Sequence, residues 1–286
     1  MNVRTPLNLR RFAFPFSKDI PRHWCGGDAA VSHLLNTYTV LVPGNEGFYI
    51  RTLQDCARER LGENPQICEE IRRFCLQEGQ HGVGHRRFWQ IFDAQGYHYR
   101  RFERGVAAFA YKFLERILPL NVRVAMVAAV EHINAFIGEE FLRADLLRDA
   151  EPETKALFEW HFAEEIEHKA VAFDVLRAVA PGYLTRVSGF LLVVPFFYLL
   201  MMVGALNFLR QDGLLLKRST WRAFRLHFWG RDHFARKTLA HLANYLRPSF
   251  HPNDADNLGL AEAVIERYAA MESSPLEAMP DRSAAA

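Results

Sequence analysis

The sequence is poor in the features that mark several classes of protein. Its four cysteines form no Cys-x-x-Cys pair, so we expect reduced thiols rather than a disulfide framework or a redox motif. No Gly-x-Gly-x-x-Gly follows a strand-like run, which argues against a bound flavin or nicotinamide. Residues 1–16 contain no apolar run of the length of a signal peptide. These absences favour a cytoplasmic protein.

An excess of charge of either sign is also missing. Lys and Arg number 35 and Asp and Glu 33, so the formal net charge is only +2 and gives no case for a nucleic-acid partner. The charge is unevenly placed, because residues 210–250 hold nine Lys or Arg and two Asp. This asymmetry predicts a basic segment that binds a surface, attached to an acidic body.

Hydrophobic residues are abundant, half of the total, and they recur with the period of a helix. No series of alternating strand-like runs appears, so the pattern predicts an all-α fold. Proline and glycine mark most of the breaks, as at Pro43-Gly44 and Pro181-Gly182. The expected helices span residues 28–41, 45–61, 65–95, 103–117, 120–148, 153–179, 184–210, 214–246 and 254–271.

One segment is apolar throughout. Residues 189–209 carry no charge over 21 positions, which is about the length of a transmembrane helix. A single span would separate the body from the basic segment, although both are expected to stay in the cytoplasm. Pro195 permits a bent or interfacial helix instead. Two interpretations remain open: contact with the inner face of the membrane, or burial inside the protein or a homodimer interface.

Candidate metal ligands occur on four successive long helices. Glu-x-x-His is expected about once by chance in a chain of this composition, but here it occurs twice, each time after a separate helix that carries a Glu. Residues three apart lie about 60° apart around a helix, so the Glu and His of each pair point the same way. The candidates are Glu46, Glu78, His81, Glu131, Glu165 and His168.

Such a ligand set is typical of ferritin-like bundles that bind two iron or manganese ions, with one Glu from each of two helices and Glu-x-x-His from the other two. Four carboxylates also balance two divalent cations, as a bundle core requires. We therefore expect a ferritin-like four-helix bundle with a dinuclear metal site and additional C-terminal helices. The expected divisions are an N-terminal extension (1–27), the metal-binding bundle (28–182), the hydrophobic helix with the basic helical segment (183–250), and a C-terminal helix with a flexible tail (251–286).

Two further histidines are candidate catalytic residues. His161 precedes Glu165 by four residues and His168 by seven, so it shares their stripe and is expected as an additional metal ligand. A third imidazole would favour a site that holds oxidised iron; a supporting or core histidine is the alternative. His85 follows His81 by one turn and is expected beside the site rather than on the metal.

Other polar residues near these motifs have weaker claims. His132 must point about 100° away from the neighbouring Glu and is expected to be structural. His33 and Asn36 would close one end of the site, or serve as surface or capping residues. Glu164 and Glu167 lie off the metal stripe and are expected to face solvent or to pair with a Lys or Arg.

At these residues the sequence resembles a bacterial family described only as predicted metal-dependent hydrolases. The resemblance implies a bound metal and, through the family's name, hydrolysis. Asn45 departs from the pattern, since the family usually has Gly immediately before the residue that corresponds to Glu46. The matching stretches are IPRHWCGGD (20–28), SHLLN (32–36), VPGNEGFYI (42–50), FCLQEGQHGVGHRRF (74–88), AAVEHINAF (128–136) and WHFAEEIEHKAVAFDV (160–175).

The ligand set also resembles that of the p-aminobenzoate N-oxygenases, which are di-iron enzymes with an added histidine ahead of the final Glu-x-x-His. His161, Glu165 and His168 match that element. The resemblance concerns ligands and bundle order only, so it implies a kind of site and not a substrate.

Three functions fit these patterns. We favour a non-haem di-iron or iron–manganese oxygenase that uses O2 to oxidise a small amine or apolar substrate, with electrons from an external donor. A dry bundle suits such oxidation because it keeps reactive species from water. The first alternative is a metal-dependent hydrolase, in which two metals generate a hydroxide. The second is a metal-binding protein without enzymatic activity.

Overall fold

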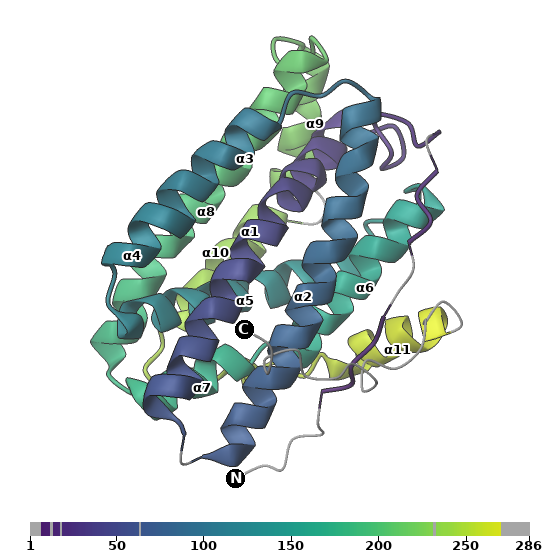
Figure 1. Cartoon of the computed structure of the whole chain (residues 1–286). Coiled ribbons are helices and arrows are strands. Elements are labelled where there is room, and N and C mark those ends of the chain that lie inside the picture. The colour runs from purple at the N-terminus through teal and green to yellow at the C-terminus, as the bar shows by residue number, and fades with distance from the viewer. Residues whose placement is uncertain (1–6, 12–13, 18, 63, 231–232, 270–286) are drawn as a thin grey trace, which may run out of the picture.

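The computed structural model describes residues 7–11, 14–17, 19–62, 64–230 and 233–269. Among these residues no strand occurs, and the all-α fold with a ferritin-like bundle is confirmed (Figure 1). Residues 270–286, which include the end of the helix expected over 254–271 and the expected flexible tail, lie outside the described part. In chain order the helices are α1 (Ala29–Arg60), α2 (Pro65–Ala94), α3 (Arg100–Val106), the π-helix η1 (Ala107–Leu114), α4 (Glu115–Ile117), α5 (Leu120–Arg143), α6 (Pro152–His168), α7 (Val171–Val179), α8 (Tyr183–Gln211), α9 (Arg218–Trp229), α10 (Phe234–Tyr245), the short 3₁₀ turn η2 (Pro252–Asp254) and α11 (Leu258–Tyr268).

Helices α1, α2, α5 and α6 form the bundle, with α1 packed along α2 and α5 packed along α6 (Figure 1). Capping side chains determine where two of them begin. The Asp28 carboxylate accepts hydrogen bonds from the backbone N–H groups of Ala30 and Val31, at 2.8 and 3.1 Å. Asn64 accepts one from the N–H of Ile67 at 3.2 Å, at the start of α2. These caps satisfy N–H groups that have no partner within the helix.

The break predicted at Pro43-Gly44 is wrong, because α1 continues through both residues. Proline cannot donate the backbone hydrogen bond that the carbonyl four residues earlier would receive. The Thr39 carbonyl accepts a hydrogen bond from the Trp89 indole N–H instead, at 3.0 Å. Gly44 leaves room for Tyr111 of η1, since a Cβ at this position would lie 2.4 Å from the Tyr111 ring. Two tertiary contacts therefore keep the helix continuous.

Two other helices predicted as continuous are interrupted. The segment 153–179 divides into α6 and α7 at Lys169, whose buried ammonium donates to the Ala255 carbonyl and the Asn257 side chain, at 2.7 and 2.5 Å. The segment 214–246 divides into α9 and α10, and His233 ahead of α10 has a φ of 47°. The helix predicted over 120–148 ends at Arg143, two residues before Asp145, whose φ is also 47°.

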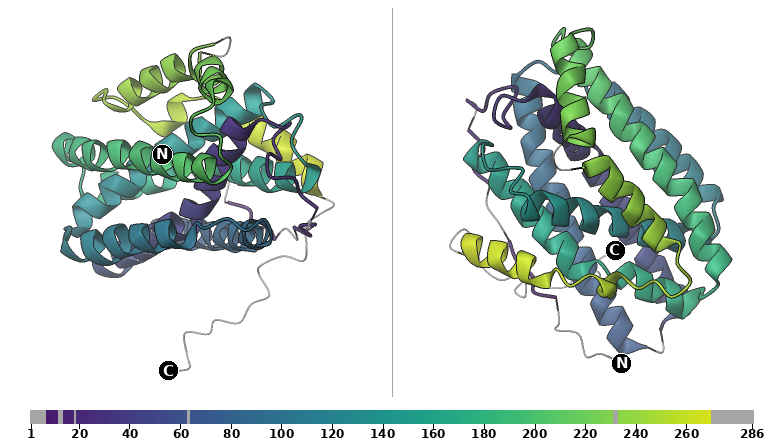
Figure 2. Two further views of the ribbon diagram at one scale, coloured as in Figure 1. Left: turned by 90° about the horizontal axis from the view of Figure 1, so that it is seen from above. Right: turned by 180° about the vertical axis from the view of Figure 1, so that it is seen from behind.

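Helix α8, which holds the apolar segment, covers the bundle on the side of α1 and α5. Glycines permit close approach: a Cβ at Gly189 would lie 2.5 Å from the Ala125 backbone, and one at Gly204 would lie 2.2 Å from Thr37. Figure 2 shows α9 and α10 folded back behind this layer. Both α5 and α8 are long and apolar enough to span a membrane, with 72% and 39% of their most apolar windows buried. Because a buried core helix passes the same test, membrane contact stays a prediction.

Candidate metal centre

The bundle brings together all seven side chains that the sequence predicts as metal ligands. Each of the four bundle helices contributes at least one of them, and none is more than 3% exposed. Six of them belong to groups of mutually close ligand atoms, and Glu131 joins them through its carboxylate, which lies 3.0 Å from Nδ1 of His168. The residues are Glu46 on α1, Glu78 and His81 on α2, Glu131 on α5, and His161, Glu165 and His168 on α6.

Their ligand atoms form two overlapping groups. In one group Glu46, His81, His161 and Glu165 each offer an atom within 4.8 Å of the others, and in the second Glu78 and His168 replace Glu46 and His161. His81 and Glu165 belong to both groups. A pair of neighbouring cations requires such an overlap, since a carboxylate can bridge two ions. The cluster is therefore compatible with a dinuclear site.

Several of these buried atoms have no hydrogen-bond partner among the described residues. Lone-pair atoms of this kind are costly to bury unless something compensates them. A positive ion at their centre would do so, and the donor set consequently fits a metal pair. The clearest cases are Oε2 of Glu46, Oε1 of Glu131 and Oε2 of Glu165, whereas Nε2 of His168 lies 3.0 Å from Oε1 of Glu78 and Nδ1 of His81 lies 3.4 Å from Oε1 of Glu46.

A carboxylate outside the cluster, that of Glu164, holds the His81 ring. The His81 Nε2 atom lies 3.0 Å from the Glu164 carboxylate, which also accepts a hydrogen bond from Arg10 at 3.2 Å. With Nε2–H donated to Glu164, Nδ1 keeps its lone pair toward the cluster, as in most metal-bound histidines. Glu164 was expected to face solvent or to pair with a Lys or Arg. It does pair with Arg10, but it is fully buried and also holds His81.

His161 is held by groups on both of its ring nitrogens. The Tyr38 hydroxyl lies 2.8 Å from Nε2, and Nε2 of His85 lies 3.3 Å from Nδ1. His85 in turn contacts the Thr39 hydroxyl through Nδ1 at 3.1 Å. The structure thus places His85 next to His161, outside both candidate ligand groups. Tyr38 was not predicted from the sequence, although it is buried against the cluster.

Charges in the cluster are strongly coupled. Burial raises the pKa of Glu46 well above its ordinary value, and the carboxylates of Glu78 and Glu165 raise it further. Burial and Glu78 together raise the pKa of Glu131 to about 7. For His168, burial lowers the pKa, but Glu78 and Glu131 outweigh this effect and leave it well above its ordinary value. Glu46 and Glu131 thus favour their neutral forms in the empty bundle, and a cation beside them would stabilise their ionised forms.

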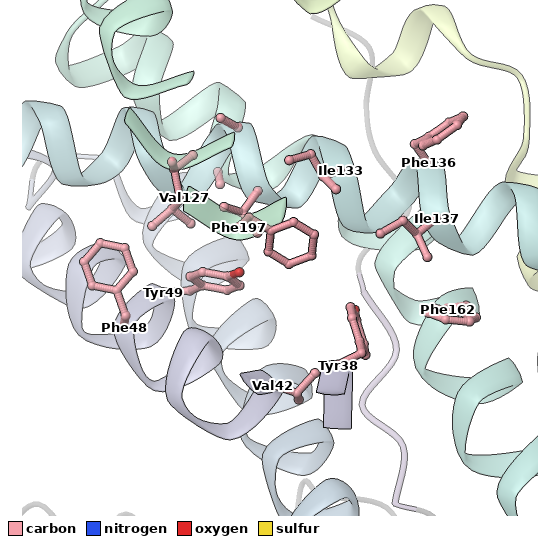
Figure 3. Packing of buried hydrophobic residues seen from close by; sticks show 14 of the residues in the cluster. Tyr38, Val42, Phe48, Tyr49, Val127, Ile133, Phe136, Ile137, Phe162 and Phe197 are labelled. Carbon is pink, nitrogen blue, oxygen red and sulfur yellow. The ribbon is translucent and has the colours of Figure 1, made fainter. Parts of the chain in front are cut away.

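The inner wall of the site is apolar. Figure 3 shows Tyr38 and Val42 of α1 facing Ile133 of α5 across the bundle, with Phe162 of α6 on one side. Val42 is 3% exposed, whereas Ile133 and Phe162 have no exposed surface. Asn134 of α5 adds a polar group, whose amide donates to Glu165 at 3.3 Å. The seven candidate ligands are correspondingly buried from solvent.

His33 and Asn36 do not close the site, but join a separate network around Asp212. The Asn36 carbonyl oxygen accepts from the Trp24 indole at 2.8 Å, so its amide nitrogen must face His33 Nδ1, 3.3 Å away. His33 Nδ1 is then an acceptor, and Nε2–H donates to Asp212 at 3.0 Å. His23 lies 2.9 Å from the same oxygen, so His23, His33 and Asp212 are close enough together to hold a metal. In this tautomer, however, both nitrogens of His33 are used in hydrogen bonds, and none is left to bind a metal.

His132 is structural, as predicted. Its ring stacks on His241 of α10 with centroids 3.8 Å apart, and each imidazole lies within hydrogen-bond distance of the other residue's backbone carbonyl. The pair joins α10 to α5, on the side of α5 away from the cluster.

Comparison with known families identifies the chain. The family model described as "Predicted metal-dependent hydrolase" matches residues 8–256, and the chain therefore belongs to that family. Comparison with curated proteins and with solved structures gives no match. The match covers all four bundle helices together with α8, α9 and α10.

Proposed function

We propose that this member of the predicted metal-dependent hydrolases binds two metal ions, iron or iron with manganese, and uses O2 to oxidise a small amine or apolar substrate. The observation that carries the proposal is the complete burial of four carboxylates and three imidazoles contributed by four helices. Once bound, the ions would supply the electrons that activate O2, and an external donor would restore them.

The chain's own residues would have three tasks. The seven donors would hold the ions, as in other ferritin-like carboxylate bundles. A metal on His161 would replace one of the two contacts at its ring nitrogens, those with Tyr38 and His85, and the remaining contact would fix the orientation of the ring. The apolar wall of the bundle would exclude water from reactive species. A closed site of this kind suits oxidation better than attack by water.

Hydrolysis is the second candidate, because the family's description names it. It would require a water that reaches both a metal and a substrate. The same cluster would hold zinc or manganese for that purpose, since carboxylate and imidazole ligands suit several divalent metals. The two functions differ in their demand for oxygen.

An oxygen-uptake experiment separates them. The metal-free protein is loaded anaerobically with ferrous iron and then mixed with air-saturated buffer, while O2 consumption and visible absorption are recorded. We expect stoichiometric O2 uptake and a transient absorption. Turnover of model esters or phosphates by the zinc or manganese form, with no O2 uptake by the iron form, would favour the hydrolase.

Matched variants tie the result to the cluster. Glu165→Ala removes an atom common to both donor groups and is expected to abolish iron binding and O2 uptake. Glu167→Ala removes a carboxylate of the same helix that contacts Arg10 outside the cluster, and it is expected to retain both. Equal O2 uptake by the two variants would exclude the cluster as the site of the reaction.

A further inference from the structure

A surface groove lies between α8 and the α3–η1 segment, which run side by side (Figure 1). Its volume is about 590 Å³, within the range of ligand pockets. Side chains of Phe109, Phe196, Leu200 and Val203 line its middle part. The lining is apolar over most of its length, so the groove suits an apolar chain.

One end of the groove is basic. His98, Arg101 and Arg210 line it where α3 begins and α8 ends. The backbone there is fixed, because the Asn207 amide donates to the His98 carbonyl at 3.4 Å and the His98 N–H donates to Gln211 at 2.7 Å. Neither Arg101 nor Arg210 has an ion pair within the described residues; Arg210 donates only to Asn207. Two exposed guanidinium groups at the end of an apolar groove favour a carboxylate.

A deeper pocket continues the groove toward the metal cluster. It shares Phe196 and Leu200 with the groove and has a volume of about 40 Å³. Its inner wall includes Tyr49, three residues after Glu46 on α1, and Val130, which precedes Glu131 on α5. Figure 3 shows Tyr49 beside Phe197, another lining residue of this pocket. The pocket therefore reaches one residue, Tyr49, on the face of α1 that carries Glu46.

Tyr49 marks the boundary between pocket and cluster. Its hydroxyl is buried and has no hydrogen-bond partner among the described residues. Burial raises its pKa well above the ordinary value, and the next contributions come from Glu131 and Glu165. The hydroxyl thus lies within the electrostatic field of the cluster.

The wall opposite α8 is a π-helix, η1. Such helices are rare and frequently occur at functional sites. Here η1 contributes Phe109 to the groove and Tyr111 to the pocket, and the Tyr111 hydroxyl donates to the Asn45 side chain. This hydrogen bond fixes the pocket wall to the residue that precedes Glu46.

We propose that the groove and pocket bind a long-chain fatty acid. The carboxylate lies between Arg101 and Arg210, and the chain passes Phe196 and Leu200 toward Tyr49. Arg210 and Leu200, which lines both the groove and the pocket, are separated by about 15 Å along α8, a distance that an extended palmitoyl chain exceeds. In this orientation the methyl end of the fatty acid is the part nearest the metal pair. That this end would be oxidised rests on the proposed function.

Binding is tested first on the metal-free protein, by displacement of a fluorescent fatty acid with palmitate. We expect the Arg101→Glu, Arg210→Glu double variant to weaken palmitate binding at least tenfold. Val203→Trp, which fills the groove, is expected to weaken palmitate and its methyl ester alike. The control Arg222→Glu changes an exposed arginine of α9 outside the groove and should bind as wild type does.

The orientation is tested in the manganese-loaded protein with palmitate labelled by ¹³C at either end. We expect stronger paramagnetic relaxation of the terminal methyl carbon than of the carboxyl carbon. Unchanged binding in the double arginine variant, or binding to anionic phospholipid vesicles without binding to monomeric palmitate, would overturn the proposal. Palmitate binding without O2 uptake would contradict only the proposed function, and O2 uptake without palmitate binding only the groove.

Discussion

A hydrogen bond to one ring nitrogen of a histidine can decide which nitrogen is free to bind a metal. His81 illustrates this. Its Nε2 atom lies 3.0 Å from the Glu164 carboxylate, and its Nδ1 atom has no hydrogen-bond partner within the described residues. Glu164 is itself held by Arg10, which donates to Glu167 as well. The chain from Arg10 through Glu164 to His81 therefore sets the orientation of one candidate ligand from the N-terminal segment.

Replacing Glu164 by Gln should weaken metal binding without unfolding the protein. The amide keeps the size of the side chain but loses the charge that orients His81 and compensates Arg10. Changes of this kind typically cost about 10–100-fold in metal affinity, and we expect a loss in that range by competition with a metal-sensitive dye. Glu167→Gln is the control, because it shares Arg10 but does not contact His81. Equal affinities in the two variants would refute this role.

The sequence predicted the seven clustered side chains because helical spacing alone places each Glu-x-x-His pair on one face. It missed the groups that hold them. Tyr38 lies about two turns before Glu46, and the helix break expected at Pro43 separated the two residues. Glu164 lies about 100° from Glu165 around α6, and only the positions of α2 and Arg10 show that its side of the helix is buried. That the seven residues bind a metal stays a prediction.

At the scale of whole helices, tertiary contacts override local signals. Proline in the interior of a helix removes one hydrogen bond and normally kinks or ends the helix. In α1 the lost donor to the Thr39 carbonyl is replaced by the indole of Trp89 on α2. The sequence around Pro43 cannot show this, because the compensating group belongs to the next helix, α2. The interruption at Lys169 has the same origin, because its partners come from residues 255 and 257.

The compensation of Pro43 by the Trp89 indole can be measured as a coupling energy between the two residues. Trp89→Phe leaves the Thr39 carbonyl without its indole donor and should destabilise the protein by about 1–3 kcal/mol. In a Pro43→Ala background, the restored backbone N–H can donate to that carbonyl. The same Trp89 change should then cost less, by about 1 kcal/mol, in urea unfolding. A Trp89→Phe cost that is identical in both backgrounds would show that the indole bond does not compensate the proline.

At the scale of the whole molecule, buried neutral histidines link stability to pH. Burial lowers the pKa of His241 to about 4, and the same cause lowers that of His33 to about 4. In the unfolded chain both would titrate near 6.5. The unfolded state therefore binds more protons between these values, and stability that is complete above about pH 6.5 is lost as the pH falls toward 4.

The His241→Phe variant isolates one of these groups. Its free energy of unfolding should fall less steeply between pH 6.5 and 4.5 than that of the wild type. The expected difference in slope approaches 1.4 kcal/mol per pH unit, the value for about one proton. Urea titrations of the metal-free proteins at several pH values measure it, and the common effect of the cluster carboxylates cancels in the comparison. Parallel curves would mean that His241 is not neutral in the folded protein.

Metal loading connects the cluster to the stability of the whole bundle. Ions that bind only the folded state stabilise it by mass action, by about 2.7 kcal/mol when their concentration is 100 times the Kd. For a protein of this size, we expect the Tm of the metal-free form to rise by about 5 °C or more with ferrous or manganous ions, and EDTA to reverse the rise.

The Glu165→Gln variant should show the opposite pattern. Burial and the carboxylates of Glu131 and Glu78 raise the pKa of Glu165, which means that its ionised form is unfavourable in the empty bundle. Removing that carboxyl should leave the metal-free Tm equal to or above that of the wild type, while the response to metal disappears. Glu262→Gln, an exposed change on α11, should keep the wild-type response. A metal-free Tm below the wild-type value would instead assign Glu165 a purely structural role. Buried carboxylates that serve metal binding destabilise the metal-free fold, whereas a carboxylate that serves the fold stabilises it.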